Sequence, residues 1–302
     1  MANFRFVLSA LVAAILTFAI SSAAQQSPAA ISADPPADKD HPAAMVAFQI
    51  PSHGAALNAI AYLPSGAGPH PAVVILHGFP GNEKNLDLAQ AIRRAGWTAV
   101  YFDYRGSWGS PGSFTFGNCI EDTITAIAYL RDPANATKLR LDSKRIAVIG
   151  HSMGGFMAAY AGSHDPQILG TGMISAANLA RMGQRGLQGQ DEKASIAAIG
   201  KSLEAEDILP LANCTGESLA RELLAHPKGW DFLGYAKEFG ARPLLLVSSD
   251  DGLKPFSDAL AKMVRENSGS QVTETHFSTD HSYSDQRIAL ETAVLNWLAT
   301  LK

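Results

Sequence analysis

Cysteine is scarce in this sequence, with two residues, Cys119 and Cys214, among 302. Two cysteines cannot form the dense disulfide framework that stabilises many small secreted domains, so that class of protein is excluded. Their separation along the chain gives no information on their distance in space. We expect two free thiols that are buried or partly buried, and a single disulfide is the alternative.

Runs of basic residues are also absent. The chain has 24 Lys and Arg against 28 Asp and Glu, a formal net charge of −4. Nucleic-acid binding requires a concentrated basic face, so we expect no nucleic-acid partner. Five histidines lack the paired spacing of metal ligands, and no metal site is predicted from them: His41, His53, His70, His164 and His226.

A long apolar run occurs at the N-terminus, where residues 6–20 follow Arg5. About fifteen apolar residues are few for a transmembrane helix of ~20. Small residues come next, and cleavage after Ala24 or Ala23 fits the small-x-small rule. Residues 1–24 are therefore predicted to be a signal peptide of a secreted or periplasmic protein, with no stable membrane association after processing. An uncleaved membrane anchor is the alternative.

The rest of the chain divides into a leader and one domain. Residues 25–44 are rich in Pro, Ala, Ser and Asp without apolar periodicity, which indicates a disordered leader. From 45 to 302, short apolar runs alternate with helical patterns. Eight strands are expected: MVAFQI and LNAIAYL as an antiparallel pair, then Ala72–His77, Trp97–Asp103, Arg145–Gly150, Ile168–Ser175, Pro243–Ser249 and Val272–Phe277. Helices are expected at Lys84–Ala95, Asn118–Arg131, Met153–Ala161, Pro255–Glu266 and Ser284–Ala299.

This alternation predicts an α/β fold with an eight-stranded, mostly parallel sheet and helices on both faces. Residues 178–240 interrupt it, since they contain helix-like pieces but no convincing strand. Connections of this length are usually functional. We therefore expect a helical cap between the sixth and seventh strands.

The fifth strand ends in GHSMG, residues 150–154, which fits the pattern G-x-S-x-G. In this motif a strand turns sharply into a helix, and glycines relieve crowding around a strained serine. A strand before the motif and a helix after it are both predicted here. Ser152 is therefore the expected nucleophile, and the amide of Met153 can stabilise a negative oxygen. A purely structural glycine-rich turn is the alternative, and His151 is expected to pack under the turn.

The loop after the third strand contains HGFPG, residues 77–81. Hydrolases with a nucleophile elbow take a second N–H donor from such a loop. The backbone amide of Phe79 is the expected donor, because Pro80 has no N–H; an ordinary Pro-Gly turn is the alternative. Three aromatic residues after the fourth strand either line an acyl pocket or pack in the core: Trp108, Phe114 and Phe116.

From residue 45 onward the chain resembles the α/β-hydrolase superfamily, on the motifs HGFPG, DYRGSWGSPG and GHSMGG. Within it, YRGSWGSPG, IEDTITAIAYL and the doubled glycine after the serine are similar to the prolyl-oligopeptidase-type catalytic domain and to related esterases. The large peptidases of that type carry an N-terminal β-propeller, for which this chain has no room. The resemblance implies a catalytic triad in the order serine, acid, histidine.

The acid should follow a strand after the serine, and LLLVSSDDGLKP offers Asp250 and Asp251. Aligning Pro255 with the proline that commonly follows the acid in this superfamily favours Asp251. Asp250 is the alternative, and one of the two is expected only to cap the loop.

The base should lie between the last strand and the last helix, where FSTDHSYSDQ places His281. Ser284 is a plausible N-cap of that helix. His276 is the alternative base, but it falls inside the strand VTETHF, where a ring would point sideways from the sheet. His281 is preferred.

Together these residues predict an exported serine hydrolase that cleaves carboxylic esters through an acyl-serine intermediate. His281 would take the proton of Ser152, Asp251 would orient the ring, and the amides of Phe79 and Met153 would stabilise the oxyanion. This chemistry requires no metal or cofactor, and the expected partner is a small ester or a short peptide. A small serine peptidase of the aminopeptidase or dipeptidyl-peptidase type is one alternative, and a catalytically inactive binding scaffold is another. The sequence gives no oligomeric state.

Overall fold

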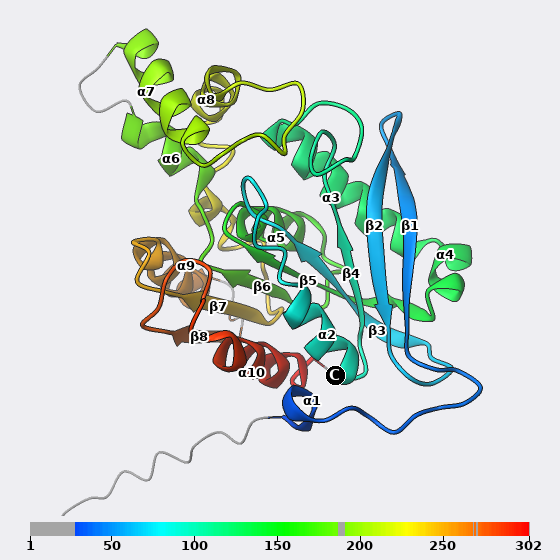
Figure 1. The fold of residues 1–302 in the computed structure, drawn as a ribbon. Helices are drawn as coiled ribbons and strands as arrows, with labels where there is room; N and C mark the ends of the chain where they lie inside the picture. Colours follow the sequence, from blue (N-terminus) through cyan, green and yellow to red (C-terminus); the bar gives the residue numbers. More distant parts are fainter. Residues whose placement is uncertain (1–27, 187–190, 268, 270, 302) are drawn as a thin grey trace, which may run out of the picture.

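An eight-stranded sheet forms the centre of the computed structural model, which describes residues 28–186, 191–267, 269 and 271–301 (Figure 1). The strands lie in the order β1-β2-β4-β3-β5-β6-β7-β8. Their bounds are β1 (Ala44–Ser52), β2 (Ala55–Leu63), β3 (His70–Leu76), β4 (Thr98–Phe102), β5 (Leu141–His151), β6 (Thr171–Ile174), β7 (Leu244–Ser248) and β8 (Val272–His276). β2 pairs antiparallel with β1 and with β4, and the other neighbours are parallel. The predicted eight-stranded, mostly parallel sheet is confirmed.

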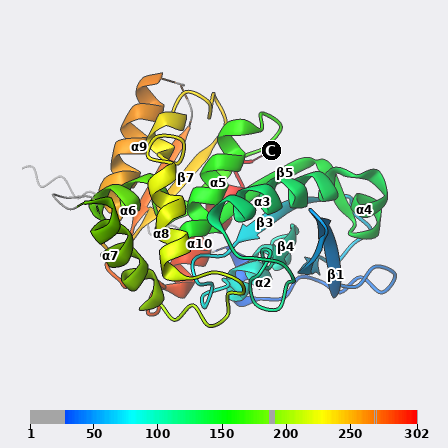
Figure 2. The same cartoon turned by 90° about the horizontal axis from the view of Figure 1, so that it is seen from above.

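Helices cover both faces of the sheet because the central strands are apolar on both sides. In β3, Val73 and Ile75 face one core, while Ala72, Val74 and Leu76 face the other. Helices α2 (Leu86–Arg94) and α10 (Arg287–Leu298) complete the first core. Helices α3 (Phe116–Arg131), α5 (Met153–His164) and α9 (Lys254–Asn267) contribute to the second, with the short α4 (Pro133–Lys138) after α3. Figure 2 shows α5 and α9 on the opposite side of the strands from α2.

The connection between β6 and β7 is helical, as predicted. It contains α6 (Leu179–Gly186), α7 (Glu192–Glu204), α8 (Gly216–Ala225) and the 3-10 turn η1 (Phe232–Tyr235), and α7 packs against α8. These helices lie together at one end of the domain (Figure 1). The Glu222 carboxylate of α8 accepts the first two amides of α3, at 2.8 and 2.9 Å. Ala212 also exchanges backbone hydrogen bonds with Gly106 and Phe114, so the cap is tied to the domain at two places.

The described part of the 25–44 leader contacts the domain. It contains a helical turn, α1 (Ala29–Ser32), although its composition predicted no element. Ala30 and Ile31 pack against the core that α2 and α10 share, and Arg94 donates to the Ala30 carbonyl at 2.5 Å. The predicted signal peptide, residues 1–24, lies outside the described residues. Within the described ranges, no helix is long and apolar enough to span a membrane.

Two expectations about single residues can be compared with the structure. Cys119 and Cys214 are free thiols, the first buried in α3 and the second half-buried in the cap. The prediction that Ser284 caps the last helix is wrong, because α10 begins at Arg287 and its N-cap is Gln286. The Ser284 hydroxyl instead donates to the Asp280 carboxylate within the preceding loop, at 2.6 Å.

Candidate active site

Ser152 stands at a sharp turn between a strand and a helix. β5 ends at His151, α5 begins at Met153, and the serine between them has φ 58° and ψ −121°. A non-glycine residue with this backbone conformation is strained and persists only where its surroundings hold it. Here the Ser152 N–H donates to Ile174 of β6 at 2.9 Å, and its carbonyl accepts the amide of Ala177 at 3.0 Å. The turn therefore has the geometry of a nucleophile elbow.

The glycines of the motif are required by backbone contacts. A Cβ on Gly154 would lie 2.0 Å from the carbonyl oxygen of Leu76 in β3. A Cβ on Gly150 would lie 1.8 Å from the carbonyl oxygen of Gly154. Backbone atoms of a central sheet cannot move away, so any larger residue would displace the helix from the strand.

Asp251 and His281 form a close pair. His281 Nδ1 lies 2.7 Å from Asp251 Oδ2, and the Asp251 side chain is 6% exposed. The second carboxylate oxygen accepts the Leu253 amide at 2.9 Å. Burial by itself would raise the pKa of Asp251, but the hydrogen bonds from His281, Leu253 and Ser175 lower it below its usual value. Asp251 is therefore ionised at neutral pH and holds the Nδ1–H tautomer of His281, which leaves Nε2 free to accept a proton.

The two alternative residues are paired with each other. Asp250 Oδ1 lies 3.2 Å from His276 Nε2, and the Asp250 side chain is 58% exposed. The Ser278 hydroxyl donates to the same carboxylate at 2.6 Å. This pair lies at the surface, whereas Asp251 is inside the domain.

His281 lies beside the strand that carries Ser152. His151 Nε2 is 2.8 Å from the carbonyl oxygen of His281, and the centroids of the two rings are 4.6 Å apart. His151 is 4% exposed, so it is packed beneath the turn. The structure thus brings the loop of the predicted base to the elbow of the predicted nucleophile.

The loop with Phe79 reaches Ser152 from the neighbouring strand. A Cβ on Gly78 would lie 3.0 Å from Ser152 Cβ and 3.5 Å from its Oγ, which places this loop directly against the serine. Met153 is the first residue of α5, so its N–H has no carbonyl of an earlier helical turn to bond. The predicted oxyanion donors therefore belong to two segments that meet at Ser152.

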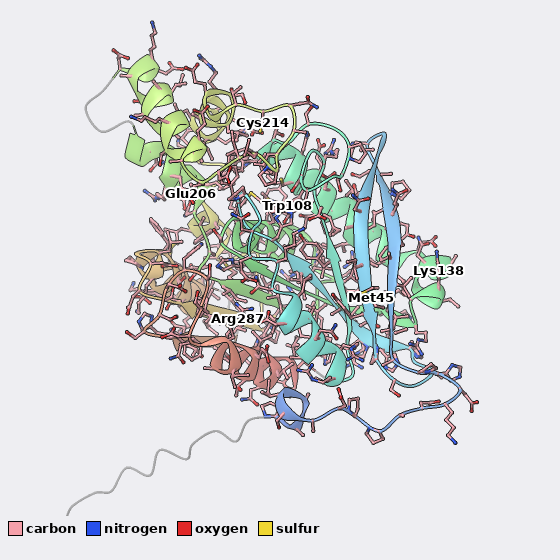
Figure 3. The ribbon with its side chains drawn as sticks, in the orientation of Figure 1. Met45, Trp108, Lys138, Glu206, Cys214 and Arg287 are labelled. Atoms are coloured by element: carbon pink, nitrogen blue, oxygen red, sulfur yellow. The ribbon has the colours of Figure 1, made fainter. Side chains whose placement is uncertain are left out.

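Aromatic residues pack against the Phe79 side chain of this loop. Phe114 and Phe116 are fully buried, and each ring lies 5.8 Å from that of Phe79. Of the two roles considered for them, core packing is therefore the one observed. The indole of Trp108 donates to the Pro80 carbonyl at 2.8 Å, and Figure 3 shows Trp108 on the cap side of the domain.

Several supporting residues were not identified from the sequence. His77 is fully buried, and its Nδ1 donates to the Gly78 carbonyl at 2.8 Å. Burial lowers the pKa of His77 to about 4, so the ring is neutral. Asp103 Oδ1 lies 3.9 Å from His77 Nε2, and it accepts hydrogen bonds from the Tyr101 hydroxyl at 2.6 Å and from Lys84 at 3.1 Å. The motifs HGFPG and DYRG identify the segments of His77 and Asp103 in the sequence, but neither motif indicates that the two segments are in contact.

Arg287, labelled in Figure 3, connects the base loop to α2 through hydrogen bonds. It donates to the Ser282 carbonyl at 3.0 Å, next to His281, and forms two hydrogen bonds to Asp87. Arg287 and Asp87 are 200 residues apart, so the sequence gives no sign of this contact.

A groove of about 900 Å³ lies between β8 and α10, and none of Ser152, Asp251 and His281 lines it. In the part of the chain that the structure describes, no group of three or more His, Cys, Asp or Glu is arranged to hold a metal ion.

Comparison with known proteins gives the fold. Residues 71–187 match the family described as the alpha/beta hydrolase fold. Est1E from Butyrivibrio proteoclasticus has a TM-score of 0.66 at 19% identity, covering 84% of this chain and 98% of that one. An esterase from Pyrococcus furiosus has 0.62 at 19% identity, covering 88% and 97%. EstE1, a thermostable carboxylesterase cloned from a metagenomic library, has 0.58 at 21% identity, covering 90% and 92%. No curated protein sequence matches the chain.

Proposed function

The chain has the α/β-hydrolase fold, and on that premise we propose that it is an exported serine hydrolase that cleaves carboxylic esters. One observation carries the proposal. Ser152 stands in a strained turn directly after His151, His151 Nε2 lies 2.8 Å from the carbonyl oxygen of His281, and the His281 ring is hydrogen-bonded to Asp251.

The reaction follows from the chemistry of these groups. A serine hydroxyl is a weak nucleophile until a base removes its proton. His281 accepts that proton through Nε2 while Ser152 Oγ bonds to the ester carbonyl carbon. The Asp251 carboxylate stabilises the imidazolium that forms. The carbonyl oxygen becomes an oxyanion, which the amides of Phe79 and Met153 stabilise.

Collapse of this intermediate breaks the bond to the alcohol oxygen, and His281 returns its proton to that oxygen as the alcohol leaves. Water then attacks the acyl-serine with His281 again acting as base, which releases the carboxylic acid and restores Ser152. The esterase from Pyrococcus furiosus and the carboxylesterase EstE1 among the structural neighbours support an ester as substrate, and a further neighbour, Est1E, has been solved with ferulic acid bound.

Export is part of the proposal because of the segment 1–24. The N-terminal sequence of the protein recovered from the periplasm or medium of an expressing cell tests it. Cleavage after Ala24 gives a mature chain that begins at Gln25. Recovery of the full-length chain in the membrane fraction would contradict export with cleavage.

The catalytic proposal is tested by labelling the purified protein with a fluorophosphonate and locating the adduct by peptide mass spectrometry. We expect the adduct on Ser152, together with turnover of short activated esters that Ser152→Ala abolishes. Ser163→Ala is the matched control, since Ser163 lies in α5 and its hydroxyl bonds to the Tyr160 carbonyl and to His164 of the same helix.

Other outcomes would redirect the assignment. Cleavage of aminoacyl or dipeptidyl anilides in preference to esters would support the peptidase alternative. Absence of any adduct and of any turnover would support the binding scaffold.

A further inference from the structure

His151 is the last residue of the strand that carries the nucleophile. Its backbone is in register with Ile174 of β6, so the residue is held within the central sheet. The side chain is buried and points to the loop between β8 and α10, where its Nε2 lies 2.8 Å from the carbonyl oxygen of His281.

The partner of His151 fixes its protonation. A carbonyl oxygen only accepts hydrogen bonds, so Nε2 carries the hydrogen. The other ring nitrogen, Nδ1, is buried and has no hydrogen-bond partner in the part of the chain that the structure describes. A charged ring would place an unpaired N–H there, at the cost of a buried unsatisfied donor. His151 is therefore a neutral ring that donates one hydrogen bond, and burial accordingly lowers its pKa to about 3.

The contact with Asp251 does not by itself fix the position of His281. That hydrogen bond holds the ring at Nδ1, but the residue belongs to an irregular loop, 277–286, between β8 and α10. A ring held only at Nδ1 can still move with its backbone. The bond from His151 reaches the main chain of the same residue, so Asp251 holds the ring of His281 and His151 holds its carbonyl.

We propose that His151 is a positioning residue: through the His281 carbonyl, its Nε2–H holds the catalytic base at a fixed place beside Ser152. The bond joins the strand of the nucleophile to the loop of the base across 130 residues of sequence. This inference rests on the proposed hydrolase function. A displacement of about 1 Å between reacting groups can cost on the order of 10²-fold in rate, so a single well-placed hydrogen bond has a measurable effect.

A matched pair of variants separates the hydrogen bond from packing. His151→Gln places an amide N–H close to the position of Nε2, and His151→Met has nearly the same length and shape without a donor. Both lose the ring, so their difference reports the donor. We expect kcat of the Gln variant to exceed that of the Met variant by roughly 10-fold or more, with similar KM for a short activated ester.

Thermal melting of both variants shows whether each is folded. If the Met variant does not fold, His151→Phe replaces it, because phenylalanine keeps a ring without a donor. Equal kcat in the two folded variants would overturn the positioning role and leave His151 as a packing residue. Failure of the proposed function is distinct, because in that case wild-type protein itself shows neither a Ser152 adduct nor ester turnover.

Discussion

Replacing Asp251 by asparagine gives the sharpest test of the candidate site, because the structure specifies which way the new amide would face. In the native side chain one oxygen accepts the Leu253 amide at 2.9 Å and the other accepts His281 Nδ1–H at 2.7 Å. The Leu253 N–H needs an acceptor, so the side-chain carbonyl of the introduced asparagine would turn toward it. The NH₂ group of the same amide would then face Nδ1 of His281.

An NH₂ group can only donate, so Nδ1 would have to give up its hydrogen and Nε2 would carry it instead. A ring in that tautomer cannot accept the Ser152 proton. The same change in a serine protease lowers kcat by about 10⁴-fold, equivalent to ~5.4 kcal/mol of activation free energy. We expect a loss of this order for Asp251→Asn with little change in KM, measured by ester hydrolysis at neutral pH.

Asp250→Asn is the control, since that carboxylate is exposed and paired with His276. Its expected activity is within about threefold of wild type, because a surface ion pair contributes little. Retention of more than a tenth of wild-type activity by a folded Asp251→Asn variant would refute the reasoning. An equal loss in both variants would do so as well.

Two further predictions concern the cap and the pH dependence of stability. Glu222→Gln should lower the free energy of unfolding in denaturant by about 1 kcal/mol, because the carboxylate of Glu222 accepts the first two amides of α3. Glu217→Gln is the control, since Glu217 is an exposed residue of the same helix and its replacement should change the stability little. Equal effects of the two substitutions would contradict this prediction. Burial lowers the pKa of His77 from 6.5 to about 4 and that of His151 to about 3, so the unfolded chain binds more protons than the folded one below pH 6.5. Their contribution to stability is complete above pH 6.5 and decreases as pH falls toward 4, by up to about 1.4 kcal/mol per pH unit for each ring. Denaturant unfolding at about pH 7 and about pH 5 measures this loss of stability. His77→Asn, which keeps a donor for the Gly78 carbonyl, should reduce the difference in unfolding free energy between the two pH values. Equal stability of the wild type at the two pH values would contradict the prediction.

The sheet and the elbow could be predicted because their signals are local. Each of the eight strands corresponds to a short strand-like run in the sequence, the first two as the antiparallel pair and the other six in the parallel part of the sheet. The turn at Ser152 depends on contiguous residues, since Gly150 and Gly154 are the positions where a Cβ would collide with backbone. The helix start at Arg287 was missed because Ser284, a good capping residue by type, bonds Asp280 instead.

The sequence could not decide between neighbouring acids on physical grounds. Asp250 and Asp251 follow the same strand, and Asp251 was preferred as the acid only because of its spacing to Pro255. In the folded chain one of them faces inward to His281 and the other outward to His276, since the two side chains project in different directions from the backbone.

By itself, then, the sequence determined the fold class and the position of the strained serine. It also indicated which segments carry the candidate acid, the candidate base and the two candidate amide donors. Tertiary structure decided which carboxylate meets which imidazole, and it brought the His151 ring to the His281 carbonyl and Arg287 to Asp87. The reason is physical. A hydrogen bond between segments 130 or 200 residues apart depends on how strands and helices pack, and such a contact leaves no pattern in either segment.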